Sequence, residues 1–297
     1  MVDVHWRPMI IQGFWTGPPL SSLHWACLKS FVACGHHFKL YSYDRLLIPE
    51  GVTLEDAREI VAADEIFYFL NSETNKADIA PFADYFRLKL LAERGGWYCD
   101  VDTICLRSSL PVGERIWARQ CPEIDIDSVS NGQLYFEKGD PIARLLLTRC
   151  EKRRPHLERR ESLGPTLISS VIKELSLPRD MGASADVFYP IRWIEIFKLW
   201  LPEFRQEIEQ RVKEAVFLPI YQSFPAYVGL DPDKLPPEGS YLFNVLRRFA
   251  PGATGLCHHP DDVRELVRTW FRSKGSWALN WLAAIRGPSV VERLALR

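Results

Sequence analysis

Residues 79–102 read IAPFADYFRLKLLAERGGWYCDVD, and this stretch decides the expected fold. Apolar side chains occupy most positions of 79–94, which predicts a helix that is buried on most of its faces. Two adjacent glycines end this helix, and the segment 97–99 predicts a buried strand directly after it. Asp100 and Asp102 follow that strand, at the edge where open α/β sheets bind their ligands.

Strands and helices alternate on both sides of this stretch. A strand at 9–15, a helix at 21–33 and a strand at 38–43 predict an α/β fold with a parallel sheet. No internal repeat, low-complexity tract or linker interrupts the chain, so we expect one domain over 1–297. The further expected elements are strands at 133–136 and 215–218, helices at 142–152, 165–175, 203–214 and 241–249, and an extended segment at 187–190.

The overall composition gives no sign of a nucleic-acid partner. The 297 residues include 37 lysines and arginines against 38 aspartates and glutamates, a formal net charge of -1. A near-neutral chain lacks the broad basic surface that binds nucleic acid. The 7 cysteines form no Cys-x-x-Cys pair, so we expect neither a zinc ribbon nor a disulfide framework.

The two ends of the chain bear on where the protein works. Residues 1–8 lack the basic region and apolar run of a signal peptide, and no stretch is long enough to span a bilayer. The tail 277–297 mixes apolar residues with arginines, which predicts a terminal helix packed on the core, with a place on a membrane surface as the alternative. We expect a cytoplasmic protein, at most peripheral to the inner face of the cell membrane.

Asp100 and Asp102 are candidate metal ligands. At i and i+2 on a regular strand they would point to opposite faces, so they converge only where the strand breaks. Convergent carboxylates repel one another, a divalent cation relieves this repulsion, and hard oxygen ligands favour Mg²⁺ or Mn²⁺. An Asp-x-Asp motif alone is common, and most copies are turns or caps, so its neighbours decide its meaning.

Asp84 and Arg87 lie one turn apart on the otherwise apolar helix at 79–94. One interpretation is a surface ion pair, which contributes about 0.2–0.5 kcal/mol. A buried helix fits this interpretation poorly, because buried charges need partners. A diphosphate suits the fork of an arginine, and the hydroxyls of a sugar suit a carboxylate.

The segments Ala83–Arg87 and Gly95–Asp102 together resemble a known family. They are similar to glycosyltransferases with a DXD sugar-binding motif, of the family-32 or capsular polysaccharide type. This group is related to yeast mannosyltransferases and large clostridial toxin glucosyltransferases. The shared pattern is a Ser/Ala-Asp-x-x-Arg helix followed, at the same spacing, by Gly-Gly-x-Tyr-x-Asp-x-Asp.

The resemblance extends over about 10–249 and implies a fold. We expect a GT-A-like, Rossmann-like mixed sheet flanked by helices, with a helical C-terminal elaboration. The nucleotide-sugar-binding core would span about 8–150. The acceptor side and the C-terminal helical part would span about 151–297.

The resemblance also implies roles for individual residues. Asp102 would be the direct metal ligand, and Asp100 would contact the metal or its water shell and the ribose or sugar. Asp84 would bind sugar hydroxyls, and Arg87 the sugar or the diphosphate.

Two further residues have both a binding and a structural interpretation. In relatives a Trp at the end of the first strand packs against the nucleotide base, and the resemblance gives this role to Trp15. The alternative is that Trp15 is a core residue at the end of a strand. Asn131 is a candidate for the sugar or acceptor side, or a turn residue before the strand at 133–136.

One position departs from the pattern. Bacterial relatives carry a His where this chain has Phe217, so the metal site would need another partner, such as Gln222, Ser223 or water. His258 and His259 are a possible substitute, although their place before an expected helix start favours an exposed loop pair.

The implied activity is metal-dependent transfer of a sugar from a UDP- or GDP-sugar, with retention of anomeric configuration. The acceptor would be a glycan, a glycolipid such as a polysaccharide intermediate, or a protein. Phe217 motivates an alternative, a sugar-nucleotide-binding protein with weak or absent catalysis. A metal-dependent phosphoesterase is a third interpretation, which no His-rich cluster supports.

Overall fold

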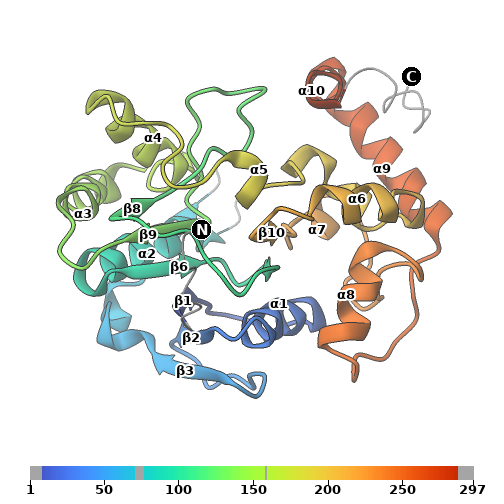
Figure 1. Cartoon of the computed structure of the whole chain (residues 1–297), viewed down its shortest axis with the longest axis horizontal. Coiled ribbons are helices and arrows are strands. Elements are labelled where there is room, and N and C mark those ends of the chain that lie inside the picture. The colour runs from blue at the N-terminus through green and yellow to red at the C-terminus, as the bar shows by residue number, and fades with distance from the viewer. Residues whose placement is uncertain (1–8, 71–76, 158, 287–297) are drawn as a thin grey trace, which may run out of the picture.

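The computed structural model describes residues 9–70, 77–157 and 159–286, and a six-stranded sheet forms its centre (Figure 1). The strand order is β3-β2-β1-β6-β9-β8. Strands β1, β2, β3 and β6 are parallel, whereas β9 is antiparallel to both of its neighbours. The predicted α/β fold with a mixed sheet is therefore confirmed. The bounds are β1 Ile10–Phe14, β2 His37–Ser42, β3 Val52–Asp56, β6 Gly96–Cys99, β8 Arg115–Ile116 and β9 Gln133–Phe136.

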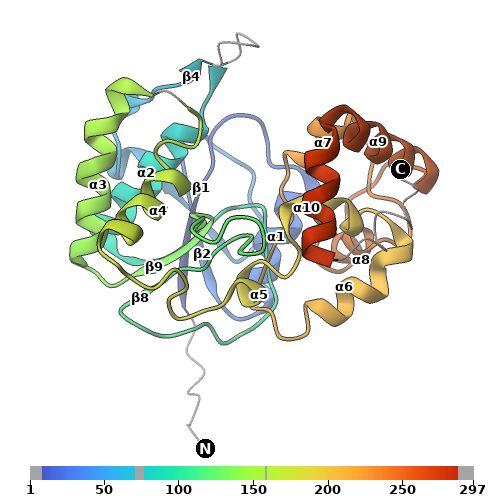
Figure 2. The ribbon, with the colours of Figure 1, turned by 90° about the horizontal axis from the view of Figure 1, so that it is seen from above.

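Helices cover both faces of the sheet (Figure 2). On one face lie α2 (Ala80–Arg94), α3 (Pro141–Arg153) and α4 (Pro165–Glu174), and their apolar sides share a core with Phe14 of β1. On the other face lies α1 (Ser22–Ala33), which packs on Ile11 of the same strand. Because side chains alternate along a strand, β1 contributes to both cores.

The C-terminal half adds a helical lobe beyond α1, as expected. Its core includes Ala26 and Cys27 of α1, so this helix is shared between the sheet and the lobe. The four-residue helix α5 (Ala185–Phe188) precedes the lobe and joins the core beside the sheet. The lobe helices are α6 Arg205–Arg211, α7 Phe224–Val228, α8 Tyr241–Phe249, α9 Pro260–Lys274 and α10 Ser276–Arg286. Two 3-10 turns, Trp193–Leu199 and Pro202–Phe204, precede α6, and three more lie earlier in the chain at Ala57–Glu59, Ala63–Glu65 and Arg154–His156.

Two expectations about local structure need correction, and one strand was missed. The segment expected to be extended at 187–190 is helical up to Phe188, because Val187 N–H and Tyr189 N–H bond back to Ser184 and Ala185. The helix expected at 203–214 is regular only over Arg205–Arg211. The parallel strand β3 was not predicted.

The chain passes from the end of α2 directly into β6 of the sheet. Gly95 caps the helix with φ 65, the left-handed region that favours glycine. A Cβ at this position would lie 2.5 Å from the backbone nitrogen of Lys138, so the close approach also requires glycine. Two glycines at the helix end thus connect α2 directly to β6.

Two short antiparallel pairs complete the description. The strand β7 (Thr103–Cys105) follows the acidic pair and bonds with β10 (Phe217–Pro219) from the C-terminal half. The strands β4 (Phe69–Leu70) and β5 (Ala77–Asp78) form a separate pair. The pairing of β7 with β10 brings the two halves of the chain together at the carboxyl end of β6.

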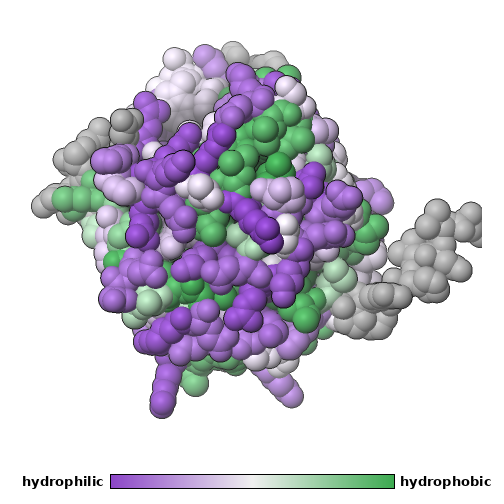
Figure 3. Space-filling model, turned by 90° about the vertical axis from the view of Figure 1, so that its left-hand side faces the viewer, coloured by the Kyte–Doolittle hydropathy of each residue, from purple (hydrophilic) through white to green (hydrophobic). Residues whose placement is uncertain are grey.

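The surface over α3 and α4 is mainly hydrophilic, with smaller hydrophobic patches (Figure 3). Within the described ranges, no helix has the length and apolar character needed to cross a membrane. The seven cysteines are free thiols in the structure, and five of them are buried. The first part of the expected terminal helix corresponds to α10, which buries Ala278 and Leu282 in the core of the C-terminal lobe. The rest of the tail, 287–297, lies outside the described residues.

Candidate functional site

Asp100 and Asp102 lie in a turn that starts where β6 ends. The N–H of Asp100 donates to Gly132 O at 2.8 Å, and the N–H of Thr103 donates to Asp100 O at 3.1 Å. A Cβ on Gly132 would lie 2.9 Å from Asp100 Oδ2, so glycine allows β9 to approach the carboxylate. The strand therefore breaks at the acidic pair, which is the condition for the two side chains to converge.

The segment after β10 supports Asp102 from the other half of the chain. The backbone N–H of Ile220 donates to Asp102 O at 2.9 Å, and that of Gln222 donates to Asp102 Oδ2 at 3.0 Å. Tyr221, between them, has φ 47, and its hydroxyl accepts a bond of 2.6 Å from Gln120 Nε2. A non-glycine residue in this conformation is strained, and such strain is found where the surroundings fix a functional geometry. Here it turns the Gln222 N–H toward the carboxylate.

Arg87 joins the helix α2 to the acidic turn. Its side chain is only 4% exposed. Nη2 donates to Asp100 Oδ1 at 2.6 Å, Nη1 donates to Asn131 O at 2.5 Å, and Nη1 also lies 3.6 Å from Asp84 Oδ1. The guanidinium lies over the Tyr98 ring, 4.5 Å from its centroid. The predicted burial of Arg87 is observed, and its partners are two carboxylates, a carbonyl and a ring.

Asp84 and Asn131 form the second part of this network. Asn131 Nδ2 donates to Asp84 Oδ1 at 2.6 Å, and both side chains are largely buried. The structure thus brings together four of the residues singled out in the sequence, Asp84, Arg87, Asn131 and Asp100, with Asp102 next along the chain.

The charges of this network do not balance. Asp84 and Asp100 lie beside the guanidinium of Arg87, and the charge of the nearby Asp102 acts on Asp100. The charge of Arg160, which pairs with Asp78, acts on Asp84. Burial raises the pKa of Asp100 to about 7, and the charges of Asp102 and Asp84 add to this increase against the opposing effect of Arg87. Burial likewise raises the pKa of Asp84. The site therefore has a deficit of positive charge that a cation would correct.

Gly164, at the start of α4, closes tightly over Asp84 and Asn131. A Cβ there would lie against Asp84 Oδ2 and 2.6 Å from Asn131 Nδ2. Neither neighbour can move without breaking the bond between them. Only glycine fits, and the sequence offered no sign of this beyond the Gly-Pro pair that starts the helix.

Gly164→Ala is expected to weaken sugar-nucleotide binding about tenfold or more, because a displacement of the order of 1 Å in a binding group is enough for such a loss. Titration calorimetry with a UDP-sugar and Mn²⁺ measures the change. Gly113→Ala is the matched control, since its Cβ would meet Arg115 O at an ordinary 3.6 Å. Equal affinity in the two variants would contradict the assignment of Asp84 and Asn131 to the site.

His24 is a residue near the site that the sequence did not single out. It is buried in the first turn of α1, and its Nδ1 accepts from the Ser21 N–H at 3.2 Å, which leaves the ring proton on Nε2 when neutral. Burial lowers the pKa of His24, while the nearby Asp102 charge opposes this. Trp15 packs against this imidazole at a tilt of 54°, with ring centroids 4.4 Å apart.

This arrangement places Trp15 on the same side as Asp102. Its indole Nε1 donates to Pro18 O at 2.8 Å, and the residue is half-buried. Its role in base binding stays a prediction. In the sequence, Ser21 and His24 indicate no more than a helix cap, which they also form.

Phe217 does not lie beside the acidic turn, contrary to the expectation. Its side chain is 0% exposed and packs between Trp97, Phe188 and Phe31. It pairs with Cys105 at the far end of β7 from Asp102. Among the alternatives, Gln222 is the residue in contact with Asp102. The departure from the family pattern therefore changes the core and not the acidic turn.

Phe217→His is expected to lower the free energy of unfolding by about 1–3 kcal/mol, because an imidazole without polar partners is costly in an apolar core. Urea unfolding measures this loss. Phe217→Leu, which keeps the site apolar, is the control and should cost less. An increase in Mn²⁺ affinity in the His variant would show that the position does reach the metal site.

The two adjacent histidines are not an exposed pair. His258 is 6% exposed, its Nε2 lies 3.1 Å from Asp231 O, and it packs against Trp200. His259 is exposed and caps α9, which begins at the next residue as expected. These contacts make both structural residues of the C-terminal lobe.

Comparisons with known proteins agree with this geometry. Residues 38–121 match the model of a family described as a glycosyltransferase sugar-binding region containing a DXD motif. This range includes Asp84, Arg87, Asp100 and Asp102. No curated protein sequence is significantly similar to the chain.

Two solved structures show weaker similarity. The PaToxG glycosyltransferase matches 57% of this chain and 69% of its own, at 16% identity and a TM-score of 0.42. The apo-form glycosyltransferase GlyE of Streptococcus pneumoniae TIGR4 matches 90% of this chain and 64% of its own, at 14% identity and a TM-score of 0.41. Residues 38–121 are thus similar to the sugar-binding region of DXD glycosyltransferases, while the narrower family-32 or capsular type stays a prediction. The matched region is 84 of the 297 residues, and it contains the acidic turn.

Proposed function

We propose that this protein transfers a sugar from a UDP- or GDP-sugar to a glycan, a glycolipid or another acceptor, with Mn²⁺ or Mg²⁺ as cofactor and with retention. The observation that carries this proposal is the single hydrogen-bonded network of Asp84, Arg87, Asn131 and Asp100, which ends beside Asp102. A network of charged groups at the carboxyl end of a sheet strand suits a polar ligand, and a bound divalent cation would allow that ligand to be an anionic diphosphate.

The acidic turn fits a hard divalent cation. Carboxylate oxygens are its preferred ligands, and the site has an excess of negative charge. Within the described part of the chain, no group of three or more His, Cys, Asp or Glu side chains gathers into a metal site. Asp100 and Asp102 would thus hold the ion together with water and substrate phosphate, as is usual for Mg²⁺. When bound, the ion would supply Lewis-acid and electrostatic stabilisation of the leaving diphosphate.

The protein groups of the network would orient the donor. Asp84 can accept from sugar hydroxyls, and its bond to Asn131 fixes the direction of its carboxylate. Arg87 holds Asp100 through a 2.6 Å bond and thereby sets the shape of the acidic turn. Retention without a separate carboxylate nucleophile favours attack of the acceptor on the same face as the departing diphosphate. Asp100 and Asp102 are next to one another in a turn, which does not suit the separated acid and base of glycosidases.

The binding-only alternative loses its main support. Phe217 motivated that alternative, and Phe217 lies in the apolar core. A phosphoesterase would release inorganic phosphate without requiring a sugar.

Thermal unfolding in the presence of sugar nucleotides tests the proposal. UDP-glucose, UDP-galactose and GDP-mannose, each with and without Mn²⁺, are screened for a rise in Tm. A donor at 100 times its Kd stabilises the folded chain by about 2.7 kcal/mol. We expect such a rise for one donor class, only with metal, followed by slow release of UDP or GDP.

The outcomes separate the three functions. Metal-dependent stabilisation together with hydrolysis or transfer supports a transferase. Stabilisation without any turnover favours a binding protein, and phosphate release without a sugar requirement favours a phosphoesterase. No stabilisation by any donor would contradict the sugar-nucleotide site itself.

A further inference from the structure

His24 lies on the side of α1 that is near the acidic turn. Burial lowers the pKa of His24 and raises that of Cys27, one turn further along the helix, and in both the nearby Asp102 charge acts to raise the pKa. Gln222 connects the two segments, since its backbone N–H donates to Asp102 Oδ2 at 3.0 Å and its Nε2 donates to Ser21 Oγ at 3.2 Å. Ser21 Oγ in turn lies 2.9 Å from His24 Nδ1. His24 is thus linked to the acidic turn through two residues.

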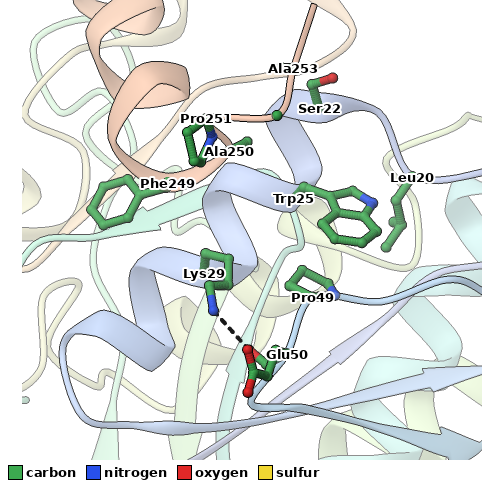
Figure 4. Close-up of a pocket in the computed structure, with 11 residues that line it drawn as sticks. Leu20, Ser22, Trp25, Lys29, Pro49, Glu50, Phe249, Ala250, Pro251 and Ala253 are labelled. Atoms are coloured by element: carbon green, nitrogen blue, oxygen red, sulfur yellow. Dashed lines mark hydrogen bonds between the residues drawn. The ribbon is translucent and has the colours of Figure 1, made fainter.

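The opposite side of α1 has a different environment. Ser22, Trp25 and Lys29 line a pocket there, together with residues of the loop before β3 and of the end of α8 (Figure 4). With 3.6 residues per turn, these three positions face away from His24 and Cys27. All of the residues that line this pocket lie in the described ranges, and none belongs to the acidic turn. A ligand at the acidic turn therefore meets α1 on the side of His24.

The hydrogen bonds of His24 determine what its ring can offer to a ligand. Nδ1 accepts from the Ser21 backbone N–H at 3.2 Å, so the proton of the neutral ring is on Nε2. Within the described part of the chain, no group hydrogen-bonds with Nε2. Nε2 is also not one of the fully enclosed polar atoms that lack a partner. Its N–H is therefore a donor that a ligand can reach.

The position of this donor indicates which part of a nucleotide it meets. A ring nitrogen that carries its proton cannot ligate a metal ion, but it can donate to an anionic oxygen. Trp15 packs against the same imidazole, with ring centroids 4.4 Å apart. In the proposed function the base lies at Trp15, and the ion at Asp100 and Asp102 holds the diphosphate. The phosphate attached to the ribose would then lie beside His24.

We propose that His24 Nε2–H donates a hydrogen bond to the ribose-linked phosphate of the bound nucleotide. This inference rests on the proposed function, because that function places a nucleotide at the acidic turn. Ser21 acts as a positioning residue, since its backbone N–H fixes Nδ1 as an acceptor and so keeps the proton on Nε2. The contact contributes to the binding of a nucleotide and not to that of its nucleoside.

Two substitutions separate this contact from the helix cap that His24 also forms. In His24→Asn the side-chain amide replaces Nδ1 and can keep the cap, whereas in His24→Gln the longer amide reaches the place of Nε2 and can donate there. Both variants lose the ring that packs on Trp15, so both should lose nucleoside affinity equally. The probes are UDP and uridine, or GDP and guanosine where the wild type binds GDP. Titration calorimetry with Mn²⁺ gives the Kd of the nucleotide, and competition gives that of the nucleoside.

We expect His24→Asn to lower the ratio of nucleotide to nucleoside affinity about tenfold or more, because a hydrogen bond to a charged acceptor is lost. His24→Gln should keep the ratio within about threefold of the wild type. His37→Asn is the control, because His37 is an exposed residue of β2 whose Nε2 lies 2.7 Å from Thr53 Oγ1. It should change neither affinity.

An unchanged ratio in His24→Asn would overturn the contact and leave His24 as a helix cap. An equal fall of the ratio in the Asn and Gln variants would also overturn it, because the fall would then follow the loss of the ring. A wild type that binds neither UDP nor GDP with Mn²⁺ would contradict the proposed function, and this role of His24 with it. A wild type that binds one of them, with the ratio unaffected by His24→Asn, would contradict the role of His24 alone.

Discussion

Asp102→Asn is expected to reduce metal-dependent sugar transfer by roughly 10²–10³-fold, the loss that follows removal of one electrostatic group at a transition state. Asparagine keeps the shape of the side chain and an oxygen that accepts from the Gln222 N–H. It removes the negative charge that a divalent cation requires. The measurement is kcat/KM for transfer or donor hydrolysis as a function of Mn²⁺ concentration.

The same substitution at Asp262 provides the control. Asp262 is an exposed residue in the first turn of α9, far along the chain from the acidic turn. Asp262→Asn should leave kcat/KM and its metal dependence unchanged. Turnover at the wild-type rate in Asp102→Asn would exclude Asp102 as the metal-binding residue. A lower rate with the same metal dependence would give it a role in positioning only.

Arg87→Met is expected to lower the free energy of unfolding by about 3–5 kcal/mol, because breaking a buried ion pair leaves uncompensated charge behind. Asp84 and Asp100 would both lose their cation, and the Asn131 carbonyl would lose its donor. Urea unfolding at neutral pH measures the loss. Mn²⁺ should restore part of the stability if it binds to the carboxylates that have lost Arg87 as their partner.

Arg149→Met is the matched control for this experiment. Arg149 pairs with Glu174 on the surface, with side chains 30% and 55% exposed, and such pairs contribute about 0–1 kcal/mol. In a double variant with Arg87→Met, Asp100→Asn removes one of the stranded charges and should recover part of the loss. A cost below 1 kcal/mol for Arg87→Met would contradict the view that Arg87 holds the site together.

Much of the candidate site follows from one local stretch. The period of apolar residues in 79–94 indicated a buried helix, and the presence of Asp84 and Arg87 on it indicated that they need partners. The glycines after it indicated an abrupt entry into a strand. The structure bears out each of these points of local structure, because helix period, glycine conformation and strand burial depend on neighbours in the sequence.

The local sequence does not predict which residues become the partners of Arg87 and Asp102. Asn131 lies 44 residues from Arg87 along the chain, and Gln222 lies 120 residues from Asp102. Both come close only because β9 pairs with β6 and β10 pairs with β7. The steric need for glycine at position 164 and the contact of Trp15 with His24 likewise depend on tertiary packing.

Phe217 shows the difference most clearly. From the sequence, an aromatic residue stands at the position of a histidine in the family pattern, and a short strand is predicted before Gln222. The contacts of this ring with Trp97 and Phe188 in the core follow from the tertiary structure. Side chains alternate along a strand, so Phe217 enters the core beside the sheet, whereas Leu218, also buried, enters the core of the C-terminal lobe. Local sequence thus determined the acidic turn and its helix, whereas strand pairing decided which distant residues complete the site.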